Sequence, residues 1–200
     1  NIELLVNAVD IAESEGFKGI VIGNDASNFC AGANLGLALF AANLGAWKDL
    51  EDFITLGQET YQTLKYCDVP VVAASAGLCL GGGAEVLMHC DAVQAHAESY
   101  IGLVEVGVGV VPAWGGCKEL LCRLVEYGLV TNGPMGAAMK AFETIGTAQV
   151  AKSAEQASSL GFLAPSDQIT MNRDGLLADA KRKVLELHED YTPPEPRTYA

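Results

Sequence analysis

An α/β fold with parallel strands, in a single domain, is the fold class that the sequence predicts. Half of the 200 residues are hydrophobic, which is enough to bury one sizeable core. Short runs rich in β-branched residues at 19–23 and 70–74 alternate with segments of helical periodicity. Such alternation is typical of a parallel sheet covered by helices.

The first expected element is a helix, because apolar residues between Ile2 and Ala12 recur near helical spacing and Gly16 marks a stop. A buried strand is predicted at 19–23, where a β-branched run ends at a polar pair. From there a loop is expected to about residue 35.

A second helix is predicted over 49–66 and a second strand over 70–74. This strand is expected to enter a glycine-rich loop at 77–83. The remaining predicted elements are a helix at 84–89, a strand at 91–97 and helices at 115–127, 151–160 and 173–190.

The two ends predict that the chain is a piece of a longer polypeptide. It opens inside a helix with no strand before it, and it lacks an initiator Met. The predicted domain covers residues 1–190. Residues 191–200 are interpreted as a Pro-rich linker or tail.

The formal net charge of −13 disfavours nucleic acids and anionic membranes as partners, because both need a field of the opposite sign. The most apolar stretch, 69–84, is interrupted by glycines and Pro70 and is too short for a membrane span. The six cysteines form no CxxC pair and are interpreted as reduced core thiols, which predicts a cytoplasmic protein. The three histidines share no metal-like spacing, so they are expected to be surface or helix residues and no metal is predicted.

Two glycine-rich segments, residues 29–35 and 81–83, place small side chains after predicted strands. Small side chains let a ligand oxygen approach backbone N–H groups, and a helix N-terminus adds its positive dipole. Together the segments predict an oxyanion hole. Two alternatives stay open: the glycines only permit turns and close packing, or they form a dinucleotide site. Against the latter, Gly77 is followed by three non-glycine residues where that fingerprint requires Gly-x-Gly.

Glu85 and Glu105 are each the only carboxylate in an apolar neighbourhood, at 84–88 and 103–107. Burial is expected to raise the pKa of both groups, and each charge raises the pKa of the other. Such carboxyl groups can act as acid and base near neutral pH. The alternative is that each caps a backbone group or pairs with a lysine.

Four ordered motifs stand out: residues 29–35 (FCAGANL), residues 70–85 (PVVAASAGLCLGGGAE), the pair Cys90-Asp91, and Glu105 leading to 112–116 (PAWGG). Together they resemble the crotonase, or enoyl-CoA hydratase/isomerase, superfamily over nearly the whole chain. The resemblance implies the family's ββα spiral with a parallel sheet and surrounding helices, here N-terminally truncated. It is closer still to the hydratase-like module of bacterial polypeptides that also carry a 3-hydroxyacyl-CoA dehydrogenase.

The resemblance implies that the backbone N–H groups of Ala31 and Gly82 hold the thioester oxygen of an enoyl-CoA. Glu85 and Glu105 would hold one water, Glu85 helping to activate it for attack at C3 and Glu105 passing a proton at C2. Family members that only shift double bonds typically lack the first glutamate, so the pair favours a hydratase of fatty-acid β-oxidation. The implied substrate-binding residues are Ala31, Gly32, Ala33, Asn34, Leu35, Gly81, Gly82, Pro112 and Trp114.

Two residues depart from the family pattern. Asn34 replaces the aspartate common after Gly-Ala, and Trp114 is bulky where small residues are common, so that it is expected to narrow or reshape the acyl pocket. Candidate contacts for the phosphates of coenzyme A are Lys18, Lys48, Lys65 and Lys118.

No cofactor is expected, because coenzyme A is part of the substrate. The implied protein partners are further copies of the chain in a trimer, or a dehydrogenase module in the longer polypeptide. The alternatives are an enoyl-CoA isomerase or acyl-CoA hydrolase of the same fold, and a non-catalytic module that binds acyl-CoA or assembles a fatty-acid oxidation protein.

Overall fold

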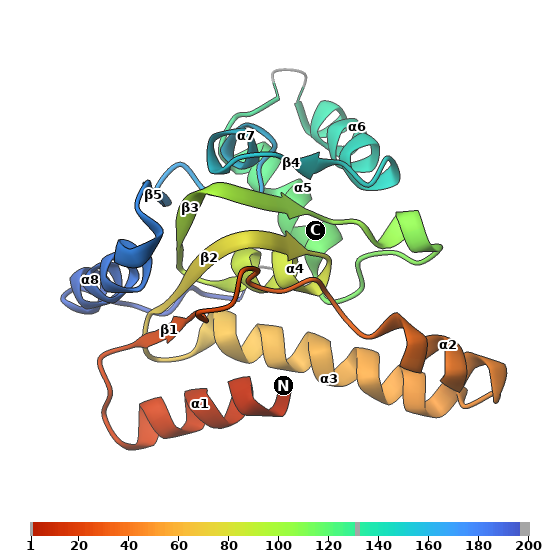
Figure 1. Ribbon diagram of the computed structural model, residues 1–200, viewed down its shortest axis with the longest axis horizontal. Coiled ribbons are helices and arrows are strands. Elements are labelled where there is room, and N and C mark those ends of the chain that lie inside the picture. The colour runs from red at the N-terminus through yellow and green to blue at the C-terminus, as the bar shows by residue number, and fades with distance from the viewer. Residues whose placement is uncertain (1, 131–132, 197–200) are drawn as a thin grey trace.

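A five-stranded sheet forms the centre of the computed structural model, which describes residues 2–130 and 133–196 (Figure 1). Its strands are β1 (Ile20–Ile22), β2 (Val71–Leu80), β3 (Ala92–Gly102), β4 (Val150–Ala151) and β5 (Gln168–Thr170). They lie in the order β1-β2-β3-β4, with β5 also paired to β3. The β1–β2, β2–β3 and β3–β5 pairs are parallel, and β4 is antiparallel to β3. The predicted α/β fold with parallel strands is therefore confirmed.

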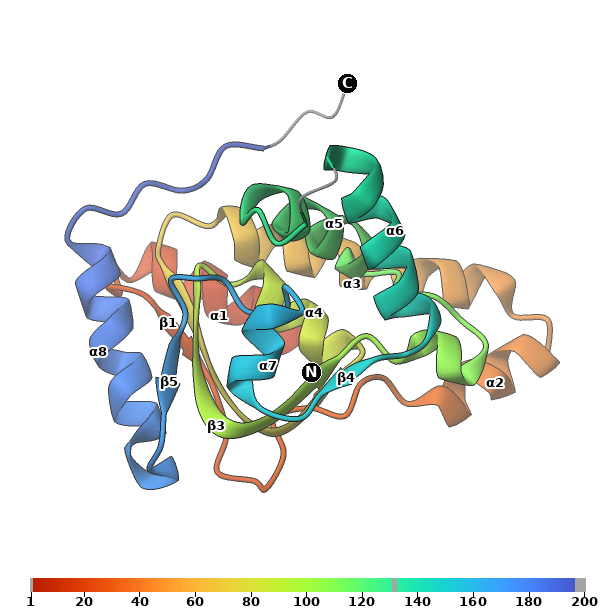
Figure 2. The same ribbon diagram turned by 90° about the horizontal axis from the view of Figure 1, so that it is seen from above.

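Helices lie on both sides of this sheet (Figures 1 and 2). They are α1 (Ile2–Ser14), α2 (Leu35–Asn43), α3 (Trp47–Tyr66), α4 (Gly82–His89), α5 (Gly116–Glu126), α6 (Gly133–Gly146), α7 (Ala154–Ser159) and α8 (Leu176–His188), with short 3-10 helices η1 (Glu105–Val108) and η2 (Arg173–Gly175). Helix α8 packs against β1, β2 and β3, α1 packs on α3, and α4 packs between β2 and α5.

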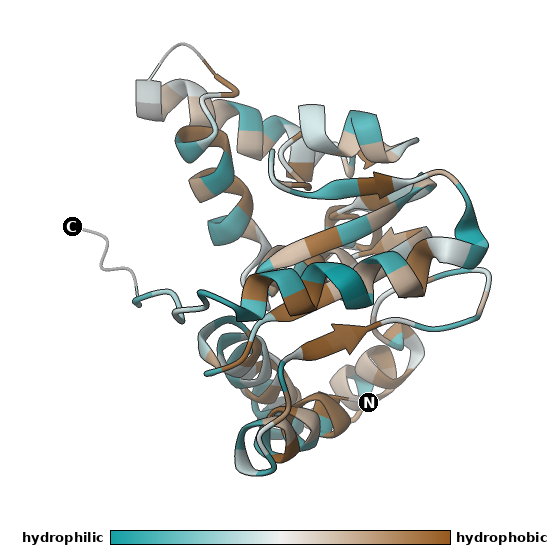
Figure 3. Cartoon of the chain, turned by 90° about the vertical axis from the view of Figure 1, so that its left-hand side faces the viewer, coloured by the Kyte–Doolittle hydropathy of each residue, from teal (hydrophilic) through white to brown (hydrophobic). Residues whose placement is uncertain are grey.

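Strand β2 is buried on both faces, and its side chains alternate between two apolar clusters. Val71, Ala73 and Cys79 belong to the larger cluster, which includes residues of α1, α3, α4, α5 and α7. The alternate residues pack in the smaller cluster beneath α8; they are Val72, Ala74 and Ala76, which join Leu176, Ala180 and Val184. Burial on both faces explains why the strand is a near-continuous apolar run, and Figure 3 shows brown and tan segments along the strands of the sheet, with teal between some of them.

The prediction of a loop over 77–83 is wrong for most of its length, because β2 continues to Leu80. A β-bulge between Ser75 and Gly77 interrupts the pairing with β3, and Gly77 has a φ of 61°. A Cβ atom at Gly77 would lie 2.2 Å from the carbonyl oxygen of Ser27. The first glycine of the motif therefore permits a bulge and a close backbone approach, while the connection to α4 begins at Gly81.

Every other predicted helix and strand is found, with shifted ends. Strand β3 extends beyond the predicted 91–97 as far as Gly102. Five elements of the described residues are absent from the sequence-based prediction: α2, α6, η1, β4 and β5. Helix α2, with the sequence LGLALFAAN, is apolar on every side, so no helical periodicity marks it.

Residues 191–196 follow α8 without regular secondary structure, and the hydroxyl group of Tyr191 donates a hydrogen bond of 3.1 Å to Asp91. The rest of the predicted tail, 197–200, lies outside the described residues. In the parts of the chain that the structure describes, no helix has the length and apolar character needed to cross a membrane.

Candidate active site

The two glycine-rich segments lie side by side at the end of β2. The N–H group of Cys30 donates to the carbonyl of Leu78 at 3.0 Å, and the N–H group of Leu80 donates to the carbonyl of Cys30 at 2.9 Å. A Cβ atom added to Gly32 would lie 4.0 Å from the backbone nitrogen of Gly82. After β1, residues near Cys30 therefore pair in parallel with the end of β2, and this pairing places the segment 29–35 beside the start of α4.

The backbone N–H groups of Ala31 and Gly82 have no hydrogen-bond acceptor among the described residues. Gly82 is the first residue of α4, where an N–H group has no partner inside the helix. Gly32, with a φ of 95°, allows the chain to turn directly after Ala31. The two N–H groups predicted to hold a thioester oxygen are thus unpaired and lie on adjacent segments.

Glu85 is a buried carboxylate in the first turn of α4, with 2% of its surface exposed. Its Oε1 accepts the N–H groups of Trp114 and Gly116, both at 2.9 Å, whereas Oε2 accepts no hydrogen bond from the described residues. Burial raises the pKa of Glu85 to about 7, with the two N–H groups opposing this shift and the charge of Glu105 adding to it. The alternative that this carboxylate caps backbone groups therefore holds for Oε1. Oε2 has no such partner in the described part of the chain and can accept a proton.

Glu105 begins η1 and lies against the connection between β2 and α4. A Cβ atom added to Gly81 would lie 3.2 Å from Oε1 of Glu105 and 3.9 Å from the α-carbon of Gly32. Both carboxylate oxygens of Glu105 are buried and have no hydrogen-bond partner among the described residues. Burial raises the pKa of Glu105. Ionising an unpaired buried carboxylate costs free energy. Groups whose pKa is shifted in this way are common at functional sites.

The two carboxylates share one neighbourhood. The thiol of Cys117 has a raised pKa, first through burial and then through the charges of both Glu85 and Glu105. The predicted upward shifts in the pKa values of Glu85 and Glu105 are confirmed in direction. The two carboxylates are therefore close enough for the charge of Glu105 to raise the pKa of Glu85.

The remaining predicted substrate-binding residues differ in their surroundings. Asn34 caps the N-terminus of α2, since its Oδ1 accepts the N–H groups of Gly36 and Leu37 at 3.1 and 3.3 Å. Ala33 and Leu35 are exposed on either side of this cap, and Pro112 is buried. Asn34 thus shapes the backbone that follows Ala31, and Oδ1 is used within the chain.

Trp114 fills the space between α3 and the start of α4. A Cβ atom at Gly57 would lie 2.2 Å from its Nε1, and one at Gly82 would lie 2.8 Å from its Cζ3. The ring stands edge-on to Phe53 and Tyr61, with ring centroids 5.2 and 5.5 Å away. The indole therefore lies directly against one of the two candidate oxyanion donors.

Two polar side chains that the sequence analysis left without a role support α4. The hydroxyl group of Tyr61 donates a hydrogen bond of 2.9 Å to the carbonyl of Gly82. His89, predicted to be a surface or helix residue, ends α4 but is buried, and burial lowers its pKa to about 4. Its Nδ1 lies 2.7 Å from the carbonyl oxygen of Glu85, where a neutral ring donates. A polar residue in a predicted helix is the only sequence signal for either contact.

Most of the candidate phosphate-binding lysines are engaged within the chain. Nζ of Lys65 lies 2.6 Å from both carboxylate oxygens of the buried Glu119, and Nζ of Lys118 lies 3.0 Å from one of them. Lys48 pairs with Asp52 at 2.9 Å along the exposed side of α3. Lys65 is thus engaged by Glu119, with only 14% of its side chain exposed, whereas Lys18 is exposed, and the predicted phosphate contacts stay a prediction.

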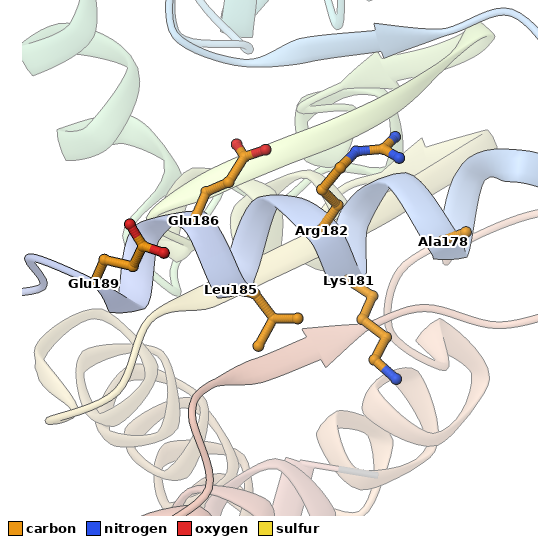
Figure 4. Close-up of a pocket in the computed structure, with 6 residues that line it drawn as sticks. All are labelled: Ala178, Lys181, Arg182, Leu185, Glu186 and Glu189. Atoms are coloured by element: carbon orange, nitrogen blue, oxygen red, sulfur yellow. The ribbon is translucent and has the colours of Figure 1, made fainter.

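A shallow hollow along the outer side of α8 is separate from this site (Figure 4). It is lined by five residues of that helix and by Glu189 directly after it; the five are Ala178, Lys181, Arg182, Leu185 and Glu186. None of the predicted site residues contributes to it. Within the residues that the structure describes, no group of three or more His, Cys, Asp or Glu side chains can hold a metal ion. The candidate active site is therefore the carboxylate pair with its two unpaired N–H groups.

Comparison with known proteins places the chain among longer relatives. It is 44% identical over 173 residues to a probable 3-hydroxyacyl-CoA dehydrogenase of Bacillus subtilis, covering 86% of this chain and 22% of that protein. It is 32% identical over 197 residues to a putative fatty acid oxidation complex trifunctional enzyme of Rickettsia prowazekii, covering 96% of this chain and 26% of that protein. A crotonyl-CoA hydratase of Syntrophomonas wolfei is 37% identical over 110 residues, or 55% of this chain and 40% of that protein. The chain thus spans less than half the length of each of these relatives.

Solved structures share the fold at low sequence identity. An enoyl-CoA hydratase from Bacillus anthracis superposes with a TM-score of 0.74 at 23% identity, over 94% of this chain and 66% of that chain. One from Polaromonas sp. JS666 gives 0.77 at 22% identity, with the same coverage. The family model described as enoyl-CoA hydratase/isomerase matches residues 2–132, a range that contains both glutamates and both glycine-rich segments. By this match, and in agreement with the resemblance of its motifs, the chain belongs to the enoyl-CoA hydratase/isomerase family of the crotonase superfamily.

Proposed function

We propose that this chain hydrates the 2,3 double bond of fatty enoyl-CoA thioesters in β-oxidation. The observation that carries the proposal is the pairing of two buried carboxylates of raised pKa, Glu85 and Glu105, beside the unpaired N–H groups of Ala31 and Gly82. An oxyanion hole and an acid/base pair are the two requirements of addition to a thioester-conjugated double bond. Relatives named crotonyl-CoA hydratase and short-chain-enoyl-CoA hydratase support the same reaction.

In the proposed mechanism, the thioester oxygen accepts the N–H groups of Ala31 and Gly82. Ionised Glu85 removes a proton from water as the water oxygen bonds to C3, and negative charge moves to the thioester oxygen. Glu105, in its protonated form, delivers its proton to C2 as the enolate collapses, and burial favours this form because it raises the pKa of Glu105. The product carries OH at C3 and H at C2, and transfer of the proton from Glu85 to Glu105 restores the starting state.

Substitution of each glutamate by glutamine tests this proposal. Both Glu85→Gln and Glu105→Gln should lower kcat for crotonyl-CoA hydration by roughly 100-fold or more, because each removes one proton transfer. The rate is followed by the loss of absorbance of the conjugated enoyl thioester. Glu98→Gln, at an exposed carboxylate on β3, is the matched control and should retain the wild-type rate. Near-normal turnover in both site variants would contradict the proposal.

Product analysis separates the related functions. Chromatography after incubation with 2-enoyl and 3-enoyl thioesters should yield the 3-hydroxyacyl product from the former. A shifted double bond alone would identify an isomerase, and free coenzyme A would identify a hydrolase. Binding of the thioester without turnover would identify an acyl-CoA-binding or assembly module.

We propose further that the chain is the hydratase part of a multifunctional fatty-acid oxidation protein that also contains 3-hydroxyacyl-CoA dehydrogenase activity. The names and greater lengths of the relatives support this assignment. The same proposal includes a domain at 1–190 followed by a tail at 191–200, a cytoplasmic location and assembly as a trimer. It also includes the use of no cofactor besides the coenzyme A that is part of the substrate. Mass measurement of the native protein in solution tests the trimer.

A further inference from the structure

We propose that Trp114 restricts this enzyme to short-chain enoyl thioesters by blocking the path that a longer acyl chain would take. The inference rests on the proposed hydratase function and adds the substrate class. It begins from the position of the ring, which lies against an oxyanion donor on one side and against α3 on the other.

The ring is held from several directions. The absent side chains of Gly57 and Gly82 create the space that it occupies, and Phe53 and Tyr61 contact it edge-on. Its own backbone N–H group is bonded to Oε1 of Glu85 at 2.9 Å. A side chain fixed in this way forms a wall that cannot be displaced without loss of these contacts.

The reacting part of the substrate must lie next to this wall. The thioester oxygen bonds to the N–H group of Gly82, whose α-carbon faces the indole, and C3 must be within reach of Glu85, to which Trp114 is bonded. A four-carbon enoyl chain has only a methyl group beyond C3. Each further CH2 group needs space past Trp114, and one methylene in an apolar pocket changes specificity by roughly 10- to 200-fold.

The experiment compares kcat/KM for enoyl-CoA thioesters of four, eight and twelve carbons in the wild-type protein, Trp114→Ala and Trp114→Phe. The wild type should prefer the four-carbon substrate. Trp114→Ala should raise the ratio of eight-carbon to four-carbon kcat/KM by at least about 10-fold, with Trp114→Phe in between. If Trp114→Ala fails to fold, as judged by its urea midpoint, the Trp114→Phe ratio decides.

Trp47→Ala is the matched control. Trp47 begins α3, is 66% exposed, and lies about 15 Å along the helix from Gly57. Its chain-length ratios should equal those of the wild type. An equal loss for all chain lengths in Trp114→Ala, or a wild-type preference for twelve carbons, would overturn the inference.

Fluorescence distinguishes failure of this inference from failure of the hydratase proposal. The chain has two tryptophans, so Trp47→Phe leaves Trp114 as the sole indole. Its emission should change on addition of four-carbon enoyl-CoA and not on addition of twelve-carbon enoyl-CoA at equal concentration. This response without turnover would refute the hydratase proposal alone, whereas turnover with unaltered chain-length ratios in Trp114→Ala would refute the inference alone.

Discussion

The backbone N–H group of Trp114 donates a hydrogen bond of 2.9 Å to Oε1 of Glu85, and so joins the loop before α5 to the first turn of α4. A second N–H group, from Gly116, bonds to the same oxygen. Because the Trp114 donor is a backbone group, substitution of the Trp114 side chain does not remove it, whereas a Cβ atom added to Gly116 would lie 3.0 Å from Oε1 of Glu85. One oxygen of this carboxylate is therefore fixed, and the other, Oε2, accepts no hydrogen bond from the described residues.

The rate of hydration is expected to follow the ionisation of the carboxylate pair. Glu85 must be ionised to act as the base, and burial raises its pKa to about 7. The value of kcat/KM for crotonyl-CoA should therefore rise through neutral pH with an apparent pKa of about 7 that belongs to the pair. Steady-state rates between about pH 5 and pH 9 check this. A flat profile would contradict the role of Glu85 as base.

Stability should depend on the same group. The folded pKa of Glu85, about 7, lies above its ordinary value of 4.5, so the folded state binds this proton more tightly than the unfolded state. Stability is therefore lost as pH rises from about 4.5 to 7. Relative to the wild type, Glu85→Gln should become more stable by about 2 to 3 kcal/mol between pH 5 and pH 8. Urea unfolding at both pH values measures this difference.

The matched control for this measurement is Glu98→Gln, because Glu98 is exposed. Its stability difference from the wild type should be nearly the same at both pH values. If the stability difference of Glu85→Gln were also the same at both pH values, ionisation of Glu85 would not destabilise the folded state, and the prediction would be wrong.

Gly57→Ala should destabilise the protein by about 1 to 3 kcal/mol, because the new methyl group would overlap the indole of Trp114. In a Trp114→Ala background the same substitution should cost clearly less, and a double-mutant cycle from urea unfolding measures the coupling. Gly146→Ala, at a helical glycine with nothing within 4 Å of the added atom, should cause no loss. Equal costs in both backgrounds would rule out the contact.

Lys65→Met should destabilise the fold by roughly 3 kcal/mol. It removes the closest cation from Glu119, whose side chain is 4% exposed, and leaves Lys118 as the nearest cation. Lys65→Met combined with Glu119→Leu should recover most of this loss, because no unpaired charge then stays buried. Lys48→Met, in the exposed pair with Asp52, should change the free energy of unfolding by less than about 0.5 kcal/mol. A double variant less stable than Lys65→Met would contradict this account.

Burial that is periodic along the chain marks some of the predicted elements, whereas β2 is predicted from a continuous apolar run that is buried on both faces. Helices α3 and α8 each have one buried side and one polar side, so their spacing is visible in the residues. Helix α2 lacks a polar side, and β4 and β5 are short segments whose strand conformation depends on pairing with β3. No local pattern marks elements of this kind.

The sequence by itself determined the chemistry available at the site: two carboxylates in apolar segments and two glycine-rich segments in motifs specific enough to identify the family. Only the tertiary structure decided that Glu85 has one fixed and one open oxygen, that Trp114 fits between Gly57 and Gly82, and that Lys65 is bound to Glu119. The physical reason is that motifs are local in the chain. Burial, pKa and side-chain contact depend on residues that only the packing of α3, α4 and α5 brings together.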